Sequence, residues 1–242
     1  MFLPLLLFDC DGTLVDSEPL LAEEMVTGLN ALGLPLTAAE YLVRFRGVRF
    51  RHIARRLQEQ YGAVPPSRLA RMEAAMRANL ARRMTDELRP ISGAIDALER
   101  LAAYPRAVVS NGTEQKIRAA LTTTGLSSRF DTPIFSGYTV NCWKPEPCLH
   151  LHAARALGFA PANCIAIDDA LVGVEAALAA GMTVIHLNRF PQAETTPANA
   201  IMIRYMNELP GVVAGLASGA SRAKSAHESL PNQTPRLDAF TK

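Results

Sequence analysis

A short, continuous apolar run that ends in acidic residues constrains the fold of this chain more than any other feature. The segment Leu3 to Phe8 carries no charge, and Asp9 and Asp11 follow it directly. The run is too short to cross a membrane, and it lacks the basic residues that precede the apolar part of a signal peptide. It is typical of a strand buried on both faces of a parallel sheet. We therefore expect a cytoplasmic protein with no membrane partner.

A helical block separates this first strand from the others. From Asp16 to about Leu88 the apolar residues recur at helical spacing, and no strand pattern interrupts them. After Pro90, short apolar strands alternate with helices, which is the pattern of a parallel sheet with right-handed crossovers. The later strands are expected at Ala107–Val109, Thr132–Phe135, Asn163–Ile167 and Met182–His186.

This order of elements predicts an α/β protein with a Rossmann-like parallel sheet core and an inserted all-helical cap domain. We assign residues 1–15 and 89–216 to the core and residues 16–88 to the cap. Residues 217–242 are rich in Ser, Ala, Pro and charge without periodicity, and we expect them to form a flexible tail.

Chemically distinctive residues follow the predicted strands, where ligands bind in open parallel sheets. After the first strand, Asp9 can attack phosphorus and form a covalent intermediate. Asp11, one residue further, can protonate the leaving oxygen and then activate water. Gly12 lets the backbone turn close to a phosphate, so that N–H groups reach its oxygens. A bare pair of acids is weak evidence, but the string with Gly12 and Thr13 after an apolar strand is specific.

Two further segments offer groups that bind phosphate. Ser110 and Asn111 end the second strand and supply a hydroxyl, an amide and backbone N–H donors. Lys144 precedes a helix start bracketed by prolines, where its charge would neutralise both a phosphate and Asp9. A solvated loop lysine and an ordinary Ser-Asn-Gly turn are the alternatives to these interpretations.

Asp168 and Asp169 follow a later strand and suit a magnesium ion. Mg²⁺ prefers oxygen ligands and commonly takes one or two carboxylates together with a substrate phosphate. Together with Asp9 and Asp11 they would form a cluster of four carboxylates, which repel one another unless a cation lies between them. We therefore predict Mg²⁺ as the cofactor.

The four segments match, in order, the motifs of the haloacid dehalogenase-like hydrolase superfamily: Asp9-x-Asp11-Gly-Thr, Ser110-Asn, Lys144-Pro and Asp168-Asp169. The resemblance spans roughly residues 3–188, and the helical block resembles the helical cap of this superfamily. Many relatives have Glu where Asp168 stands and Ser where Ala170 stands.

The resemblance implies a role for each matching residue. Asp9 would be the nucleophile and Asp11 the acid and base. Mg²⁺ would be held by the carboxylates of Asp9 and Asp169 and by the backbone carbonyl of Asp11, with Asp168 nearby. The transferring phosphate would be held by Ser110 and Lys144.

The cap is rich in arginine, which presents a planar fork suited to carboxylate or phosphate. Between Tyr41 and Thr85 the arginines are Arg44, Arg46, Arg49, Arg51, Arg55, Arg56, Arg68, Arg71, Arg77, Arg82 and Arg83. Most would belong to a solvated basic face. In capped relatives the loop at the position of Gly47 faces the active site, so Arg46 and Arg49 are the candidates for binding an anionic group of the substrate.

A sugar or sugar-acid phosphate such as 6-phosphogluconate fits this interpretation. Three segments resemble those of bacterial 6-phosphogluconate phosphatases: Arg44 to Arg49, Ser136 to Tyr138 and Trp143 to Pro145. We expect a magnesium-dependent phosphatase that acts on a small phosphorylated metabolite through an aspartyl-phosphate.

Three other functions remain possible on the sequence alone. A β-phosphoglucomutase-like enzyme shares the core and cap, but such relatives commonly have a His early in the first cap helix, where this chain has none. A dehalogenase needs neither Asp11 nor a metal site. A non-catalytic binding or regulatory module usually lacks one of the catalytic groups, and here all are present.

The overall charge and the cysteines set weaker limits. The net charge is +2, which gives no field attracting nucleic acid or a membrane. We expect a monomer or weak dimer without a nucleic-acid partner. The four cysteines have no C-x-x-C spacing, so we expect buried free thiols: Cys10, Cys142, Cys148 and Cys164.

Overall fold

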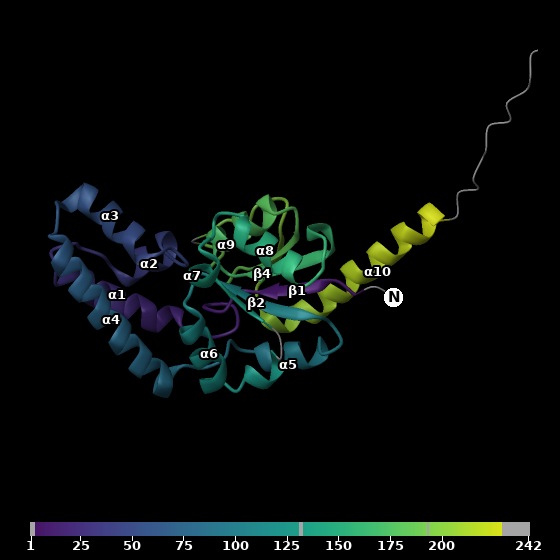
Figure 1. The fold of residues 1–242 in the computed structure, drawn as a ribbon, viewed down its shortest axis with the longest axis horizontal. Coiled ribbons are helices and arrows are strands. Elements are labelled where there is room, and N and C mark those ends of the chain that lie inside the picture. Colours follow the sequence, from purple (N-terminus) through teal and green to yellow (C-terminus); the bar gives the residue numbers. More distant parts are fainter. Residues whose placement is uncertain (1–2, 131–132, 193, 229–242) are drawn as a thin grey trace, which may run out of the picture.

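A six-stranded parallel sheet forms the centre of the computed structural model, which describes residues 3–130, 133–192 and 194–228 (Figure 1). The strand order is β3-β2-β1-β4-β5-β6, and every neighbouring pair is parallel. The strands are β1 Leu5–Phe8, β2 Arg106–Ser110, β3 Ile134–Ser136, β4 Cys164–Asp168, β5 Thr183–Leu187 and β6 Ile201–Ile203. The predicted parallel α/β core is therefore confirmed.

The first strand is apolar throughout because helices cover both faces of the sheet. All residues of β1 are buried, and successive side chains point to opposite faces. Leu6 and Phe8 belong to one hydrophobic cluster, whereas Leu5 and Leu7 belong to the other. Burying each such side chain stabilises the fold by about 2 kcal/mol relative to leaving it in water.

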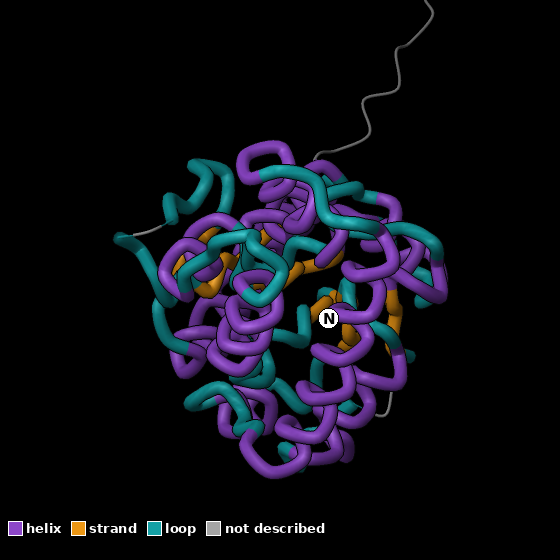
Figure 2. Tube along the Cα trace, turned by 90° about the vertical axis from the view of Figure 1, so that its left-hand side faces the viewer, coloured by secondary structure: helices purple, strands orange, loops and turns teal. Residues whose placement is uncertain are grey.

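Each cluster is completed by helices on its own side of the sheet. The first contains residues of α5 Ala94–Arg100, α6 Glu114–Thr123 and α10 Leu209–Glu228. The second is covered by α7 Gly137–Val140, α8 Cys148–Ala156 and α9 Leu171–Ala179. Short 3₁₀ turns are found at Ser127–Arg129, Pro161–Asn163 and Met206–Glu208. The view along the molecule shows helices surrounding the central strands (Figure 2).

The residues between β1 and α5 form a helical insertion with its own core. Its helices are α1 Glu18–Asn30, α2 Ala38–Arg44, α3 Phe50–Tyr61 and α4 Pro66–Glu87. A separate hydrophobic cluster, which includes Leu29, Tyr41 and Ile53, holds them together. The insertion extends away from the sheet in Figure 1.

The two ends of the insertion meet at the sheet. The N–H of Asp16 donates to the carbonyl of Arg89 at 2.9 Å, and Val15 forms an isolated bridge with Pro90. These contacts support a boundary near residues 16 and 88. The division into a core of residues 1–15 and 89–216 and a cap of residues 16–88 stays a proposal.

Two elements differ from the sequence-based expectation. The short edge strand β6 had not been expected. Helix α10 continues to Glu228, although we expected a flexible tail from residue 217. Leu209, Val213 and Ala217 recur at helical spacing and are buried, and alanine-rich sequence favours helix. The rest of the expected tail lies outside the described residues. Within the described part of the chain, no helix is both long and apolar enough to span a bilayer.

Candidate active site

The predicted catalytic residues meet at the carboxyl ends of three adjacent strands. β1 lies between β2 and β4, so Asp9, Ser110 and Asp168 follow or end neighbouring strands. Each strand is short and fully buried, and a polar residue ends it or follows it at this edge of the sheet. This edge is where an open parallel sheet binds ligands.

Lys144 bridges two of the carboxylates. Its Nζ lies 2.7 Å from Oδ1 of Asp9 and 2.6 Å from Oδ2 of Asp168, and the side chain is buried. Burial alone would lower the pKa of Lys144, but the charges of Asp168 and Asp9 and their hydrogen bonds raise it above its ordinary value. Lys144 therefore carries a permanent positive charge inside the acidic site.

Asp9 experiences opposing influences. Burial raises the pKa of the Asp9 carboxyl well above its ordinary value, Lys144 lowers it, and the neighbouring Asp168, Asp169 and Asp11 raise it further. Lys144 alone thus does not balance the negative charge. A further cation at this position would favour the ionised form of Asp9, which is the nucleophilic form.

Asp11 points to a different set of partners. Its Oδ1 accepts a hydrogen bond from the hydroxyl of Ser17 at 2.6 Å, and its Oδ2 accepts one from Nζ of Lys116 at 2.7 Å. Burial would raise the pKa of Asp11, but Lys116 and Ser17 lower it below its ordinary value. The carboxylate is therefore held ionised and fixed in orientation by α1 and α6.

Three carboxylates gather where the metal ion was predicted. Asp9, Asp168 and Asp169 each place an oxygen within 4.8 Å of the others. The pKa of Asp169 is raised well above its ordinary value by burial, against the influence of Arg46. An all-oxygen set of this kind fits Mg²⁺. The carboxylate of Asp11 lies outside this set, which is compatible with a ligand role for its backbone carbonyl only.

Two glycines allow the acidic loops to approach one another. A Cβ at Gly12, where φ is +83°, would lie 2.3 Å from Oδ2 of Asp169. A Cβ at Gly173 would lie 1.8 Å from Oδ2 of Asp168. Both distances are far below any real contact, so any larger residue would displace a carboxylate of the cluster.

Ser110 and Asn111 both line the cavity with Lys144, but their side chains have different hydrogen-bond partners. The hydroxyl of Ser110 accepts a hydrogen bond from the N–H of Gly112 at 3.3 Å. The amide of Asn111 accepts from the N–H of Lys144 at 2.8 Å and donates to the carbonyls of Lys144 and Gly47. Asn111 thus connects the Lys144 loop to the insertion, and its amide donors are already occupied.

The loop between α2 and α3 enters the site, as the resemblance implies. Gly47, with φ +69°, and Arg49 line the cavity. The guanidinium carbon of Arg49 lies 3.7 Å from the centre of the Trp143 ring, which orients this arginine by a cation–π contact.

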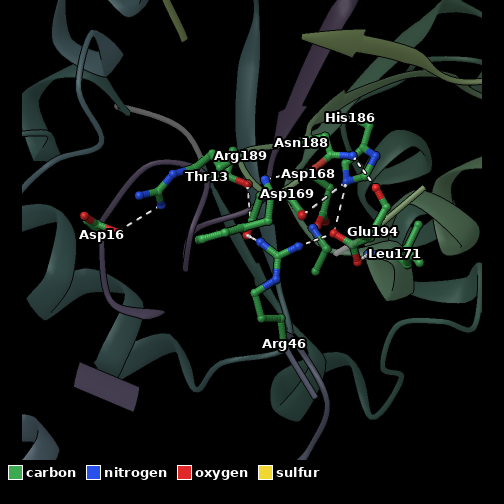
Figure 3. A network of polar contacts seen from close by, with 12 residues as sticks. Thr13, Asp16, Arg46, Asp168, Asp169, Leu171, His186, Asn188, Arg189 and Glu194 are labelled. Carbon is green, nitrogen blue, oxygen red and sulfur yellow. Dashed lines mark hydrogen bonds and ion pairs between the residues drawn. The ribbon is translucent and has the colours of Figure 1, made fainter. Parts of the chain in front are cut away.

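Arg46 has other contacts than expected. We expected it to bind the far end of the substrate, but its buried guanidinium lies 3.2 Å from Oδ2 of Asp169 and contacts Glu194 (Figure 3). Glu194 in turn accepts from the N–H of Leu171 and lies 3.6 Å from Nε2 of His186. In this arrangement Arg46 connects the insertion to the core beside a predicted metal ligand.

Sequence reasoning missed Glu18, Lys116 and Glu194. Glu18 follows the acidic motif in the first turn of a helix, where an acid is favourable for the helix itself and so indicates no further role. Lys116 lies in the first turn of the helix after Ser110 and Asn111, a position that faces the same end of the sheet. Glu194 lies far from both Arg46 and Asp169 in the sequence, so no local pattern indicates its partners.

A cavity of about 460 Å³ opens onto these groups. Its polar end includes Asp9, Asp11, Ser110 and Lys144, and much of its remaining wall comes from the insertion and from α6. This volume falls within the range of small-molecule sites. The cavity is therefore large enough for a metabolite and not only for a phosphate group.

Comparison with known proteins identifies the family. The model of the haloacid dehalogenase-like hydrolases matches residues 6–187. This chain belongs to that family. A 6-phosphogluconate phosphatase of Escherichia coli (strain K12) is 38% identical over 181 residues, 74% of this chain and 80% of that protein. A phosphoglycolate phosphatase of Thiobacillus denitrificans is 32% identical over 180 residues, 73% of this chain and 79% of that protein.

Solved structures agree with this assignment. A HAD family hydrolase from Deinococcus radiodurans R1, solved with bound phosphate and sodium, has a TM-score of 0.69 and 30% identity. The match covers 89% of this chain and 96% of that chain. The family assignment and the prediction of a phosphoric monoester hydrolase within it are confirmed.

A disulfide encloses the loop that carries Lys144. Cys142 and Cys148 are bonded, with their Cα atoms 6.1 Å apart. Our expectation of free thiols is wrong for this pair, because a turn closed by the N–H of Glu146 and the carbonyl of Trp143 brings the two ends of the loop together. Cys10 and Cys164 are free and buried, as expected.

Reducing this disulfide is expected to lower the free energy of unfolding by about 2 kcal/mol, the loop-closure contribution of a short ring. Urea unfolding with and without dithiothreitol measures the difference. A variant combining Cys142→Ser and Cys148→Ser is expected to show the lower stability in both conditions. Equal stability of the wild-type protein with and without reductant would contradict this prediction.

Proposed function

We propose that this chain is a magnesium-dependent phosphatase that works through an aspartyl-phosphate at Asp9. The observation that carries the proposal is the contact of Lys144 with both Asp9 and Asp168 in a buried cluster of carboxylates. A lysine held between two acids at the end of a parallel sheet is suited to neutralise phosphate and nucleophile together.

The chain supplies two groups for two chemical steps. In the first, an oxygen of Asp9 attacks phosphorus, and the bond between phosphorus and the ester oxygen breaks. The leaving oxygen receives a proton from Asp11, which is ionised in the site without substrate and so has to take up that proton when the anionic ester binds beside it. In the second, Asp11 takes a proton from water as the water oxygen attacks phosphorus, and the bond to Asp9 breaks. Inorganic phosphate is released, and Asp9 is regenerated. Ser17 and Lys116 hold Asp11 in place between the steps.

The metal site would be formed by the carboxylates of Asp9 and Asp169 and the backbone carbonyl of Asp11, with Asp168 nearby. When bound, Mg²⁺ supplies positive charge that favours phosphoryl transfer between anionic groups. Lys144 and Ser110 would bind the transferring phosphate. Arg46 contacts Asp169 in the described arrangement, so we propose that it supports the metal ligand instead of the substrate.

The substrate is proposed to be a sugar or sugar-acid phosphate such as 6-phosphogluconate. A relative that is 38% identical bears the name 6-phosphogluconate phosphatase. Arg49 lines the cavity and supplies a positive charge for a carboxylate at the far end of such a substrate. We also propose that the protein acts as a monomer or weak dimer in the cytoplasm, where the Cys142–Cys148 disulfide would be open to reduction by cellular thiols.

Metal removal tests the function directly. Phosphate release from 6-phosphogluconate, glucose 1-phosphate and other metabolites is measured with Mg²⁺ and with EDTA. We expect release to fall at least about 100-fold in EDTA, because stabilisation of a developing charge of this size is typically worth that factor. Adding back excess Mg²⁺ is the control and should restore the rate.

Each other outcome points to a different function. Release that is unchanged in EDTA would contradict the metal site. Conversion of glucose 1-phosphate to an isomer without free phosphate would indicate a mutase. Equal rates across the panel would keep the mechanism and exclude the preference for sugar acids.

A further inference from the structure

Glu18 is a buried acid that lines the cavity. It is the first residue of α1, and only 3% of its surface is exposed. Among the residues that the structure describes, its Oε2 has no hydrogen-bond partner. Buried carboxylate oxygens are almost always paired, so an unpaired one that lines a cavity indicates a ligand. The proposed mechanism uses Asp9, Asp11 and Lys144 and leaves Glu18 without a role.

The wall around Glu18 is mostly apolar. Leu21 and Met25 extend it along α1, and Met76, Leu80 and Met84 face them from α4. Ala119 and Ala120 of α6 complete this side. Among the described lining residues, Glu18 is the single acid besides the strand-end aspartates Asp9, Asp11 and Asp168. A ligand in this part of the cavity therefore meets hydrocarbon on most sides and one carboxyl group.

The position of Glu18 specifies which part of the ligand it can reach. Its neighbour Ser17 donates to Asp11 at 2.6 Å, so Glu18 enters the cavity next to the group that serves the leaving oxygen. Burial, and after it the negative charge of Asp11, raises the pKa of Glu18 to about 7. The group that meets Glu18 thus lies close to the ester oxygen and not at the far end of the substrate.

The groups around Glu18 give no net attraction for a cationic ligand. In the part of the chain that the structure describes, the cavity lining includes four cations, Arg49, Arg77, Lys116 and Lys144, and an equal number of carboxyl groups, Asp9, Asp11, Glu18 and Asp168. A neutral hydroxyl group can therefore meet Glu18 without the cost of taking a further charge out of water. A hydroxyl can donate its proton to an ionised carboxylate or accept one from a protonated carboxyl.

We propose that Glu18 binds a hydroxyl group that the leaving group carries near its phosphate ester, while the carbon skeleton lies against the apolar wall. This inference rests on the proposed phosphatase function and narrows its substrates to phosphate esters of polyols or sugars. Glu18 is then a specificity residue: it selects the leaving group and takes no part in the transfer of phosphate.

Two phosphate esters that differ in their hydroxyl groups test the proposal. Glycerol 3-phosphate has a hydroxyl on the carbon next to the ester-bearing carbon, and n-propyl phosphate has none. We expect wild-type kcat/KM to favour glycerol 3-phosphate by at least about tenfold, since a site built to bind a hydroxyl discriminates against the analogue that lacks it. In Glu18→Ala, kcat/KM for glycerol 3-phosphate should fall at least about tenfold, whereas the value for n-propyl phosphate stays within about threefold.

The outcomes separate this inference from the function on which it rests. Equal losses on both esters would overturn it, because a structural or catalytic role affects both alike. A wild-type enzyme that does not discriminate between the esters would also overturn it. Hydrolysis of p-nitrophenyl phosphate reports the phosphatase function by itself, so its absence from the wild-type protein would remove both the function and the inference.

A stability measurement distinguishes recognition from support of the fold. Glu18→Gln keeps the size of the side chain and removes an unpaired buried charge, so its melting temperature at pH 8 should rise by about 2–4 °C. A lower melting temperature would indicate a structural role and contradict the proposal. Glu59→Gln is the matched control, because the Glu59 side chain is 61% exposed on α3. In this variant both the melting temperature and kcat/KM for the two esters should be unchanged.

Discussion

Replacing Asp9 by Asn is expected to lower kcat for phosphate release by at least about 1000-fold, or about 4 kcal/mol of barrier. The amide keeps the shape of the carboxyl group but has no charge with which to attack phosphorus. It also removes one of the oxygens gathered at the predicted metal site. The measurement is steady-state phosphate release with saturating Mg²⁺ on the best substrate of the panel.

The fold of this variant should be intact. Lys144 keeps its contact with Asp168 at 2.6 Å, and the substitution relieves repulsion among the carboxylates. We therefore expect the free energy of unfolding to change by no more than about 1 kcal/mol, the scale of one hydrogen bond. A variant that folds normally and retains activity within about tenfold of the wild type would exclude Asp9 as the nucleophile.

The features predictable from sequence are those encoded locally. The buried strand β1 is a continuous apolar run, and Asp9 and Asp11 follow it directly, so their place at the sheet edge required only strand geometry. Ser110 and Asp168 could be predicted for the same reason. The helical insertion could be predicted because its apolar residues keep helical spacing.

The features missed depend on contacts between distant segments. The partners of Arg46 are Asp169 and Glu194, which are 123 and 148 residues away in the sequence. Sequence alone showed an arginine in a loop near the active site, and an anionic substrate was the simplest partner. The folded chain supplies two buried carboxylates instead, and burial strengthens such pairs because water no longer screens them.

Lys116 and Glu18 show a second limit of prediction from sequence. Each lies in the first turn of a helix, where a charged side chain is ordinarily exposed and has little energetic weight. Glu18 is buried and Lys116 is mostly covered because α1, the first helix of the insertion, and α6 of the core both begin at the active-site edge of the sheet. Only the packing of the insertion against the core turns these two helix starts into walls of one cavity.

The disulfide could not be predicted from the sequence for another reason. Cys142 and Cys148 are too far apart in sequence for a C-x-x-C motif, and their pairing depends on the path of a proline-containing loop. Because this loop carries Lys144, the bond limits how far the lysine can move from the carboxylates that it bridges.

Replacing Lys144 by Met is expected to affect both stability and activity. The lysine is buried between Asp9 and Asp168, and its loss leaves two buried carboxylates without their cation. Removing one partner of a buried ion pair costs about 3–5 kcal/mol of unfolding free energy. Loss of a preorganised charge at the phosphate should also lower kcat by at least about 100-fold. Urea unfolding and phosphate release measure the two effects.

A second substitution separates charge imbalance from packing. In the double variant Lys144→Met/Asp168→Asn, one of the two uncompensated charges is removed together with the lysine. We expect this variant to recover more than half of the lost stability and none of the lost activity, because the carboxylates no longer repel but the phosphate still lacks its cation. If the stability of Lys144→Met were within about 1 kcal/mol of the wild type, the lysine would not be the group that holds these acids together. If the double variant were no more stable than the single one, the loss would arise from packing and not from charge.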